Sequence, residues 1–307
     1  MNIASIDIGT NTILLLIAKV NSERTGLELV HEEIRMPRIG HELNRSGKIP
    51  EEKIIELEEV LLEYKTIISQ YNCSECYVIG THALRIASNN KDIQKRILEN
   101  TSLSIEIISP ENEAEYAFYG ILASKKIENS FAIVDIGGGS TEVIVCENDK
   151  ISFKRSIPIG VVTLKDILFN GYPISEDEDL QLKNRINLEL GKLDLKHHAP
   201  TTLVGISGTP TTLSAIKNNL TSFDHAVIEN SIIYRNDIMS ILDILKKSSL
   251  EEIIKIYGNI ISKREDILYI GGVILLNIMS YLNISEVKVS TFGIRHGVIY
   301  KKMIAAK

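Results

Sequence analysis

The sequence predicts an α/β protein built from two domains of common topology that face one cleft. Its 307 residues suit two domains of about 150 residues each. Residues 6–12, which read IDIGTNT, recur as residues 134–141, which read VDIGGGST. Each half also places its strands before most of its helices, as α/β domains do. We therefore expect one domain to duplicate the other.

The first half is expected to open with a hairpin. A short apolar strand runs into Asp7, a loop with glycine and hydroxyl residues turns the chain, and a β-rich run follows at 13–20. A third strand is expected at 27–34. Ile54, Leu57 and Leu61 recur at helical spacing and predict an amphipathic helix over 51–71.

Two more strands in this half each lead into a helix. The strand at 77–80 enters a helix through 81–85, and the strand at 103–108 precedes Ser109 and Pro110. Serine is a good helix cap and proline suits the first helical position, so a helix is expected to begin at Pro110. Glu113 then lies in its first turn.

The second half repeats the scheme. Strands are expected at 131–135, 142–147 and 151–157, and helices at 161–170 and 176–192, where Ser175 and Glu178 form a capping-box pattern. A strand at 201–206 enters the segment SGTPTT, and a helix follows it. The rest is mainly helical, with a strand at 287–290 and a last helix from about Arg295. The apolar run 267–282 is too short to span a bilayer and predicts a buried helix.

Composition and charge exclude several functional classes. Hydrophobic residues make up 44% and charged residues 24% of the chain, as in ordinary globular proteins. A net charge of −6 argues against DNA and membrane surfaces as partners, because such binding faces are usually basic. Three cysteines and the lack of a signal peptide favour the cytoplasm. Cys73 and Cys76 have CxxC spacing but lack a second ligand pair for zinc.

The glycine-rich repeat indicates a phosphate site. Gly137, Gly138 and Gly139 expose backbone N–H groups, which bind anions, and Ser140 and Thr141 add hydroxyl donors. Asp135 would repel phosphate unless a cation lay between them, and Mg²⁺ suits such a set of ligands. A tight hairpin would also use glycines, but it would not need aspartate and hydroxyl residues in both copies. Neither GxGxxG before a helix nor GxxxxGK[ST] occurs.

Six segments together carry a family resemblance. They are DIGTNT at 7–12, GTHALR at 80–85 with Asn89, SPENEAEY at 109–116 with Gly120, DIGGGSTE at 135–142, KRED at 263–266 with Gly271 and Gly272, and FGIRHG at 292–297. Their order resembles that of the exopolyphosphatase and guanosine pentaphosphate phosphohydrolase (Ppx/GppA) family, in a short two-domain form. The resemblance implies duplicated actin-, Hsp70- and sugar-kinase-like (ribonuclease H-like) domains that flank a phosphate-binding cleft. It places these domains at 1–122 and 123–294, with the helix 295–307 packing back on the first.

The resemblance also implies a role for individual residues. Glu113 matches the catalytic base that orients water, while Asp135, Glu142 and Asp7 match the acidic residues around the metal. The other matched residues bind phosphate: Gly9, Thr10, Asn11, Thr12, Arg85, Gly137, Gly138, Gly139, Ser140 and Thr141. Gly208, Thr209, Arg264 and Arg295 are candidates for further substrate contacts.

Each assignment has a structural alternative. Glu113 could serve only the dipole of its helix, Glu142 could face solvent, and Arg85 and Arg295 could pair with surface acids. We assign no catalysis to the histidines at 82, 197, 198 and 296, which lack metal-ligand spacing. The chain departs from the family pattern by threonines in the first loop and by His296, where the family commonly has glutamate.

The expected activity is hydrolysis of the terminal phosphoanhydride of inorganic polyphosphate, which releases orthophosphate with Mg²⁺ as cofactor. The alternative is removal of the 5′ γ-phosphate from guanosine pentaphosphate to give the tetraphosphate. A non-catalytic alarmone sensor or an ATP-dependent kinase of the same fold is the alternative of another class, and a homodimer is compatible with each. Because the chain ends soon after Arg295, without the helical domain of the family's long forms, we expect a preference for short chains or the nucleotide.

Overall fold

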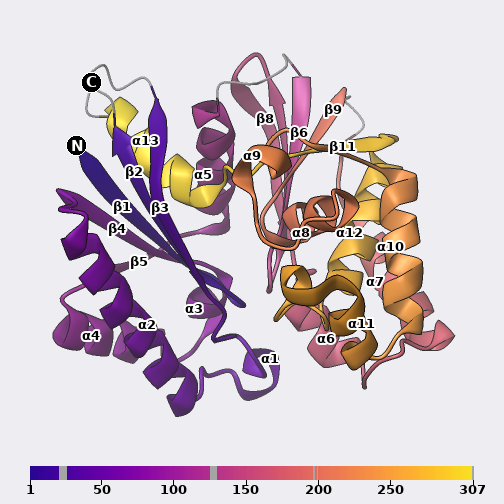
Figure 1. The fold of residues 1–307 in the computed structure, drawn as a ribbon, viewed down its shortest axis with the longest axis horizontal. Coiled ribbons are helices and arrows are strands. Elements are labelled where there is room, and N and C mark those ends of the chain that lie inside the picture. Colours follow the sequence, from indigo (N-terminus) through magenta and orange to yellow (C-terminus); the bar gives the residue numbers. More distant parts are fainter. Residues whose placement is uncertain (21–25, 125–129, 196–197, 199, 306–307) are drawn as a thin grey trace. The chain divides into compact units, whose positions relative to one another are not determined.

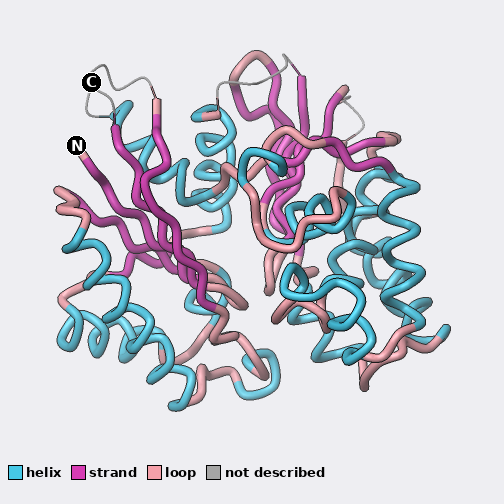
Figure 2. Tube along the Cα trace, viewed as in Figure 1, coloured by secondary structure: helices cyan, strands magenta, loops and turns pink. Residues whose placement is uncertain are grey.

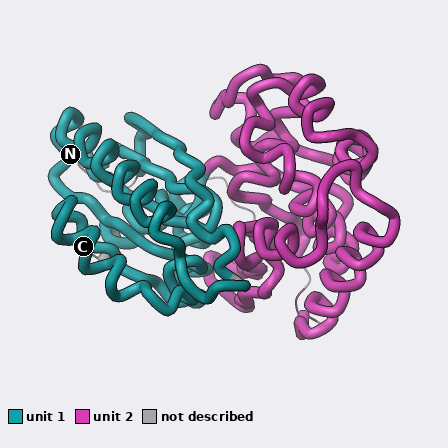
Figure 3. The backbone as a smooth tube through the Cα atoms, turned by 90° about the horizontal axis from the view of Figure 1, so that it is seen from below, with its two compact units in different colours: residues 1–127, 292–307 teal, residues 128–291 magenta. Residues whose placement is uncertain are grey.

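The computed structural model describes residues 1–20, 26–124, 130–195, 198 and 200–305. The chain forms two units, which are described separately (Figure 3). Unit 1 comprises Met1–Ile127 and Phe292–Lys307, and unit 2 comprises Glu128–Thr291. The helix expected near the end of the chain therefore lies in unit 1. No helix that the structure describes is both long and apolar enough to cross a membrane.

Unit 1 contains a five-stranded sheet in the order β3-β2-β1-β4-β5 (Figure 1). β1, β2 and β3 pair antiparallel, whereas β4 and β5 continue from β1 in parallel. The strands are β1 (Asn2–Ile8), β2 (Ile13–Val20), β3 (Leu27–Arg35), β4 (Glu75–Gly80) and β5 (Ile105–Ile107). The helices are α1 (Leu43–Ser46), α2 (Glu51–Gln70), α3 (His82–Ile86), α4 (Asn90–Thr101), α5 (Pro110–Ala123) and α13 (Ile294–Ala305).

Alternation along the strands gives this sheet two apolar faces. Ala4, Ile6 and Ile8 of β1 belong to one core cluster together with residues of α2 and α4. Ile3 of β1 and Leu16 of β2 point the other way and pack with Ile299 and Met303 of α13. Because successive side chains of a strand face opposite sides, one short sequence supplies both layers. The sheet is consequently covered by helices on both faces.

Unit 2 contains a six-stranded sheet in the order β10-β11-β9-β6-β7-β8 (Figure 2). The strands are β6 (Ser130–Ile136), β7 (Thr141–Glu147), β8 (Lys150–Ile157), β9 (Thr202–Ile206), β10 (Ile232–Tyr234) and β11 (Glu286–Val289). The α-helices are α6 (Val161–Leu168), α7 (Glu176–Leu190), α8 (Gly208–Lys217), α9 (His225–Ile228), α10 (Arg235–Lys247), α11 (Leu250–Tyr257) and α12 (Leu268–Tyr281). A 3₁₀ helix, η1, spans Gly258–Ile261.

The two sheets confirm the predicted duplication. β1 to β4 and β6 to β9 have the same spatial order, with two antiparallel neighbours on one side and a parallel neighbour on the other. In β1, Asp7 pairs with Leu14, and in β6, Asp135 pairs with Glu142. The two copies therefore agree in register as well as in sequence, but only the second places a carboxylate on the partner strand.

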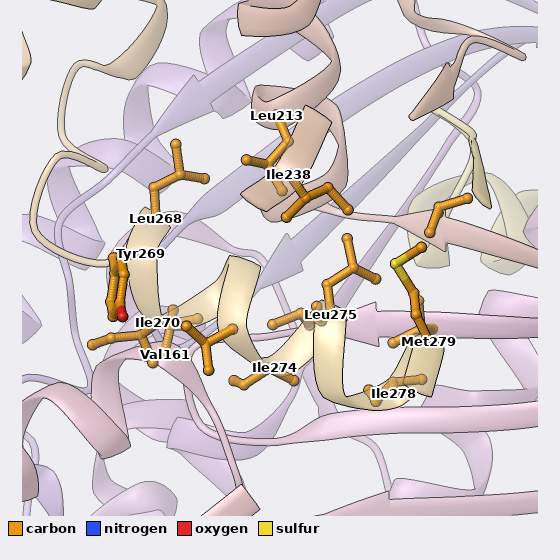
Figure 4. Packing of buried hydrophobic residues seen from close by; sticks show 14 of the residues in the cluster. Val161, Leu213, Ile238, Leu268, Tyr269, Ile270, Ile274, Leu275, Ile278 and Met279 are labelled. Atoms are coloured by element: carbon orange, nitrogen blue, oxygen red, sulfur yellow. The ribbon is translucent and has the colours of Figure 1, made fainter. Parts of the chain in front are cut away.

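α12 is the predicted buried helix. Ten of its residues are buried, and Ile270, Ile274 and Leu275 among them belong to the core cluster of unit 2. Figure 4 shows these side chains together with Val161 of α6, Leu213 of α8 and Ile238 of α10. A helix surrounded by other elements needs no polar face, so its sequence lacks the periodicity of a surface helix.

Candidate functional site

The parallel strands of unit 1 bring three sequence motifs to one edge of the sheet. The backbone N–H of Thr81, after β4, donates to the carbonyl of Ile8 at 3.1 Å. The N–H of Ile108, after β5, donates to the carbonyl of Gly80 at 3.0 Å. Ligands of α/β sheets bind beyond the carboxyl ends of parallel strands. The first glycine loop, the segment of Arg85 and the start of α5 all leave the sheet at that edge.

The first loop is a four-residue turn whose carbonyl groups are tied back to the protein. The N–H of Gly9 donates to the carbonyl of Thr12 at 2.9 Å. The carbonyls of Thr10 and Asn11 accept N–H groups from Gly40 and Arg38 at 2.9 and 3.2 Å. Thr10 and Asn11 are buried. No backbone carbonyl of the described residues accepts the N–H of Thr10 or Asn11, so these donors suit an anion.

Arg85 and Glu113, which follow β4 and β5 at this edge of the sheet, form an ion pair. Nη1 of Arg85 lies 3.0 Å from Oε2 of Glu113 and also donates to the carbonyl of Ile108 at 2.8 Å. The predicted cap of α5 is confirmed, because the side chain of Ser109 accepts the N–H of Asn112 at 3.2 Å. That cap fixes the first turn of α5, and Glu113 with it.

The second loop, in unit 2, repeats the geometry of the first. The N–H of Gly137 donates to the carbonyl of Ser140 at 2.9 Å, as Gly9 does to Thr12. The carbonyls of Gly137 and Gly138 accept N–H groups of Val161 and Val162, in the first turn of α6, at 3.0 and 2.9 Å. Within the described ranges, the N–H groups of Gly138 and Gly139 have no backbone acceptor. Here too the donors are left for a ligand.

Asp135 and Glu142 lie opposite each other on β6 and β7 and are both buried. Oε1 of Glu142 accepts the hydroxyls of Ser140 and Ser156 at 2.9 and 2.6 Å. Oδ1 of Asp135 accepts the hydroxyl of Ser207. Burial raises the pKa of Asp135 to about 6, and the Ser207 hydrogen bond opposes this shift. The sequence-based alternative that Glu142 faces solvent is wrong, because only 1% of the residue is exposed.

These two carboxylates fit a magnesium ion. Directly opposite residues of antiparallel strands project from the same face, and Mg²⁺ commonly takes one or two protein carboxylates together with water and phosphate oxygens. Asp7, the third predicted ligand, lies in unit 1. The described residues contain no group of three or more His, Cys, Asp or Glu that could hold a metal. The protein itself would therefore supply few ligands.

The N-terminus of α8 adjoins the same edge of unit 2. Ile206 pairs with Asp135, so Ser207 and Gly208 follow directly beyond the sheet. The guanidinium group of Arg264 packs on Gly208, where a Cβ atom would lie 3.2 Å from Cζ, and its Nη1 donates to Thr212 Oγ1 at 2.8 Å. Burial lowers the pKa of Arg264 to about 10, which leaves it protonated at neutral pH. Thr209 is buried against Gly271 of α12.

Known proteins of one family resemble this chain in sequence and in fold. The model of the Ppx/GppA phosphatase family matches residues 16–306. The chain belongs to the Ppx/GppA phosphatase family. A solved Ppx/GppA structure from Aquifex aeolicus has 29% sequence identity and a TM-score of 0.85, and the match covers 100% of this chain and 99% of that one. For the exopolyphosphatase structure from Cytophaga hutchinsonii, the identity is 26%, the TM-score 0.91 and the coverage 100% and 99%.

This Ppx/GppA chain covers a different share of each of two curated relatives. Exopolyphosphatase 2 of Mycobacterium tuberculosis is 30% identical over 251 residues, which is 78% of each chain. A bifunctional 3-dehydroquinate synthase/phosphatase of Fusobacterium nucleatum is 28% identical over 288 residues, which is 91% of this chain but 43% of that protein. This Ppx/GppA chain therefore spans less than half the length of the Fusobacterium relative.

Arg295 of this Ppx/GppA protein is engaged within unit 1. Its Nη1 lies 3.1 Å from Glu32 Oε1 and donates to the carbonyl of Leu15 at 3.1 Å. Both side chains of the ion pair are about nine-tenths buried, at 11% and 10% exposure. This placement favours a role in holding α13 on the sheet over a role in binding substrate.

The histidines and cysteines to which no catalysis was assigned have packing and pKa shifts that do not indicate a reactive group. The ring of His296 packs on Phe292 with centroids 4.3 Å apart, and its Nδ1 accepts the N–H of Gly293 at 3.3 Å. Burial lowers the pKa of His82 to about 4. Burial also raises the pKa of the Cys76 thiol to about 12, and Cys73 shifts the same way, so neither is a ready thiolate. His197 lies outside the described residues.

Sequence reasoning missed three residues that support the Ppx/GppA loops. Ser207, the first residue of the SGTPTT segment, contacts Asp135 and adopts φ 71°, ψ −168°, a region that non-glycine residues rarely occupy. Gly40 and Gly160 lie against the two loops, where a Cβ atom would overlap Thr10 and Gly138 respectively. The sequence carries a sign of the two glycines. In both places a strand is followed by a proline and then by an isoleucine that directly precedes the glycine.

A surface cavity of about 420 Å³ lies elsewhere in unit 2, between α7, α10 and α12. None of the candidate site residues lines it. Two of its cationic side chains, Lys183 and Lys246, are both paired with Asp179 at 2.8 Å. The chemistry of the family is therefore better sought at the glycine loops than at this cavity.

Proposed function

We propose that this Ppx/GppA protein hydrolyses the terminal phosphoanhydride of inorganic polyphosphate and releases orthophosphate. The observation that carries the proposal is the pair of matched loops, each with its carbonyls tied back and with backbone N–H groups left for an anion. Glu113, paired with Arg85, supplies a carboxylate at the same edge of the sheet of unit 1. The relative named exopolyphosphatase, at 30% identity, supports polyphosphate as the substrate.

Glu113 acts as the base in this proposal. Its carboxylate takes one proton from water as the water oxygen bonds to the terminal phosphorus, and the electron pair of the broken bridging P–O bond stays on the shortened chain. The donors proposed for phosphate oxygens are the N–H groups of Thr10 and Asn11 in unit 1 and those of Gly138 and Gly139 in unit 2. Asp135 and Glu142 are the residues that would hold Mg²⁺, which would supply positive charge for phosphoryl oxygens.

Guanosine pentaphosphate is the second candidate substrate. It ends in the same kind of phosphoanhydride. The family name, Ppx/GppA, joins the exopolyphosphatases with the guanosine pentaphosphate phosphohydrolases. A catalytically silent sensor or an ATP-dependent kinase of the same fold is less well supported, because a carboxylate base and the two opposed carboxylates are all present.

A phosphate-release assay tests the proposal. The purified chain is given polyphosphate, guanosine pentaphosphate or ATP, each with and without Mg²⁺. We expect Mg²⁺-dependent release, and Glu113→Gln should lower kcat about a hundredfold or more while sparing binding. Glu111→Gln, an exposed glutamate in the same first turn, is the matched control and should leave turnover unchanged. Full activity of Glu113→Gln would remove Glu113 from the mechanism.

A further inference from the structure

Only one nitrogen of the Arg85 guanidinium group, Nη1, donates hydrogen bonds to the described part of the protein. Its Nη1 donates to both Glu113 Oε2 and the carbonyl of Ile108. Nε and Nη2 make no hydrogen bond within the part of the chain that the structure describes. The side chain is 19% exposed, whereas that of Glu113 is 8% exposed. One edge of the guanidinium group thus remains available while the opposite corner is engaged.

Guanidinium chemistry allows both edges to work at once. The group is planar, stays charged and carries five N–H donors in fixed directions. The Nε–Nη2 edge matches two oxygens of a phosphate, and this does not require Nη1 to leave its carboxylate. A lysine ammonium would keep the charge but would lack the fixed second edge. Arginine at this position can therefore do more than bind an anion.

Both anchors of the pair are rigid. Ile108 directly follows β5, and its N–H is bonded to Gly80 at the end of β4. The N–H of Glu113 donates to the carbonyl of Ser109 at 2.9 Å in the capped first turn of α5. His82, one turn before Arg85 on α3, has a pKa lowered to about 4 by burial and by the Arg85 charge, so it adds no second positive charge there at neutral pH. Backbone hydrogen bonds thus hold both partners of the Arg85–Glu113 pair within unit 1.

We propose that Arg85 is a positioning residue that joins the catalytic base to the substrate: Nη1 holds the Glu113 carboxylate while the Nε–Nη2 edge binds the terminal phosphoryl group. This inference rests on the proposed function. A single rigid group then sets the separation between base and phosphorus. Small errors in such a separation cost rate rather than affinity.

A double-mutant cycle tests the coupling. The variants are Arg85→Lys, Glu113→Gln and the double variant, and phosphate release from inorganic triphosphate gives kcat and KM. Arg85→Lys should lower kcat about 10- to 100-fold with KM changed less than about threefold. When Glu113→Gln is already present, Arg85→Lys should lower kcat by less than about twofold, because Arg85 acts through Glu113. Arg96→Lys, at an ion pair of α4 outside the site, is the matched control.

The possible outcomes distinguish a failure of this inference from a failure of the proposed hydrolase function. If the wild-type protein releases no phosphate from polyphosphate, the proposed function fails. If the protein is active but Glu113→Gln keeps full turnover, Glu113 is not the base and this inference alone is overturned. If Glu113→Gln loses turnover but the losses of the two variants multiply, or if Arg85→Lys raises KM alone, Arg85 is only an anion ligand and the inference is overturned. Should Arg85→Lys not fold, a crystal structure of the wild-type protein with inorganic phosphate decides: Arg85 must contact Glu113 and phosphate together, and a guanidinium group that leaves Glu113 overturns the proposal.

Discussion

Asp135 shows how one buried residue links binding to stability. The residue is 4% exposed, its carboxylate accepts the Ser207 hydroxyl, and its pKa is raised to about 6. In an unfolded chain the pKa would be about 4. Between these values the folded state binds more protons than the unfolded state, so the free energy of unfolding falls as the pH rises. Above about pH 6 the bare charge opposes folding, and a bound cation would offset it.

Asp135→Asn should therefore stabilise the protein at high pH only. In EDTA at about pH 8, we expect the free energy of unfolding to rise by about 1–3 kcal/mol, because the buried charge is gone while an acceptor for Ser207 remains. Well below about pH 4, where Asp135 is neutral in both states, the difference should vanish. Thermal melting at both pH values measures this, and Asp194→Asn, in an exposed loop, is the control. Equal melting of wild type and Asp135→Asn at high pH would contradict the assigned shift.

Each glycine loop depends on a second element that backs it. In unit 1, the segment after β3 supplies the N–H groups of Arg38 and Gly40, and in unit 2 the start of α6 supplies those of Val161 and Val162. Gly160 lies where a Cβ atom would overlap the backbone of Gly138 and Gly139. Backbone cannot move aside as a flexible side chain can. The element that holds the loop must therefore carry glycine at the point of contact.

Gly160→Ala should displace the second loop. We expect a loss of about 3 kcal/mol in stability and a fall in kcat of about tenfold or more, because the donors of Gly138 and Gly139 shift. Gly171→Ala is the matched control, since a Cβ atom there meets nothing within 4 Å. Thermal melting and phosphate release measure the two effects. If Gly160→Ala behaves like Gly171→Ala, the loop does not need this close approach.

Across the whole chain, the last helix returns to the first unit. α13 packs its Ile299 and Met303 on the sheet, and Arg295 pairs with Glu32 of β3. It also crosses α5, the helix that begins with the turn of Glu113, where Gly297 lies against the carbonyl of Tyr116. Unit 1 is thus completed by residues far from the rest of it in sequence. Its stability and the placement of Glu113 both depend on that crossing.

Gly297→Ala should force α13 and α5 apart. A Cβ atom at this position would overlap the Tyr116 carbonyl, so we expect a loss of about 3 kcal/mol or more and a lower kcat. Lys302→Ala, at an exposed position of α13, should change little. Thermal melting with phosphate release from the folded protein measures both. Unchanged stability of Gly297→Ala would mean that the helices do not cross this closely.

The sequence alone determined the repeat, the two hairpins, the cap of α5 and the family, because these depend on local chemistry: aspartate before glycine, serine before proline, and apolar alternation. It also identified the residue types around each loop. It did not reveal β10 or α4, which are short or strongly polar, and it ended α6 and α7 two residues late at Asn170 and Lys192. Such ends depend on packing and on competing local bonds.

Only the tertiary structure decided which of the named side chains meet. It paired Arg85 with Glu113, Ser207 with Asp135 and Arg295 with Glu32. It also showed that Gly40 and Gly160 allow the close approach of a neighbouring segment to each loop. These contacts join strands and helices that are distant in the chain, and their geometry follows from sheet order and register. A motif states what a residue can do, whereas its partner is set by the fold that surrounds it.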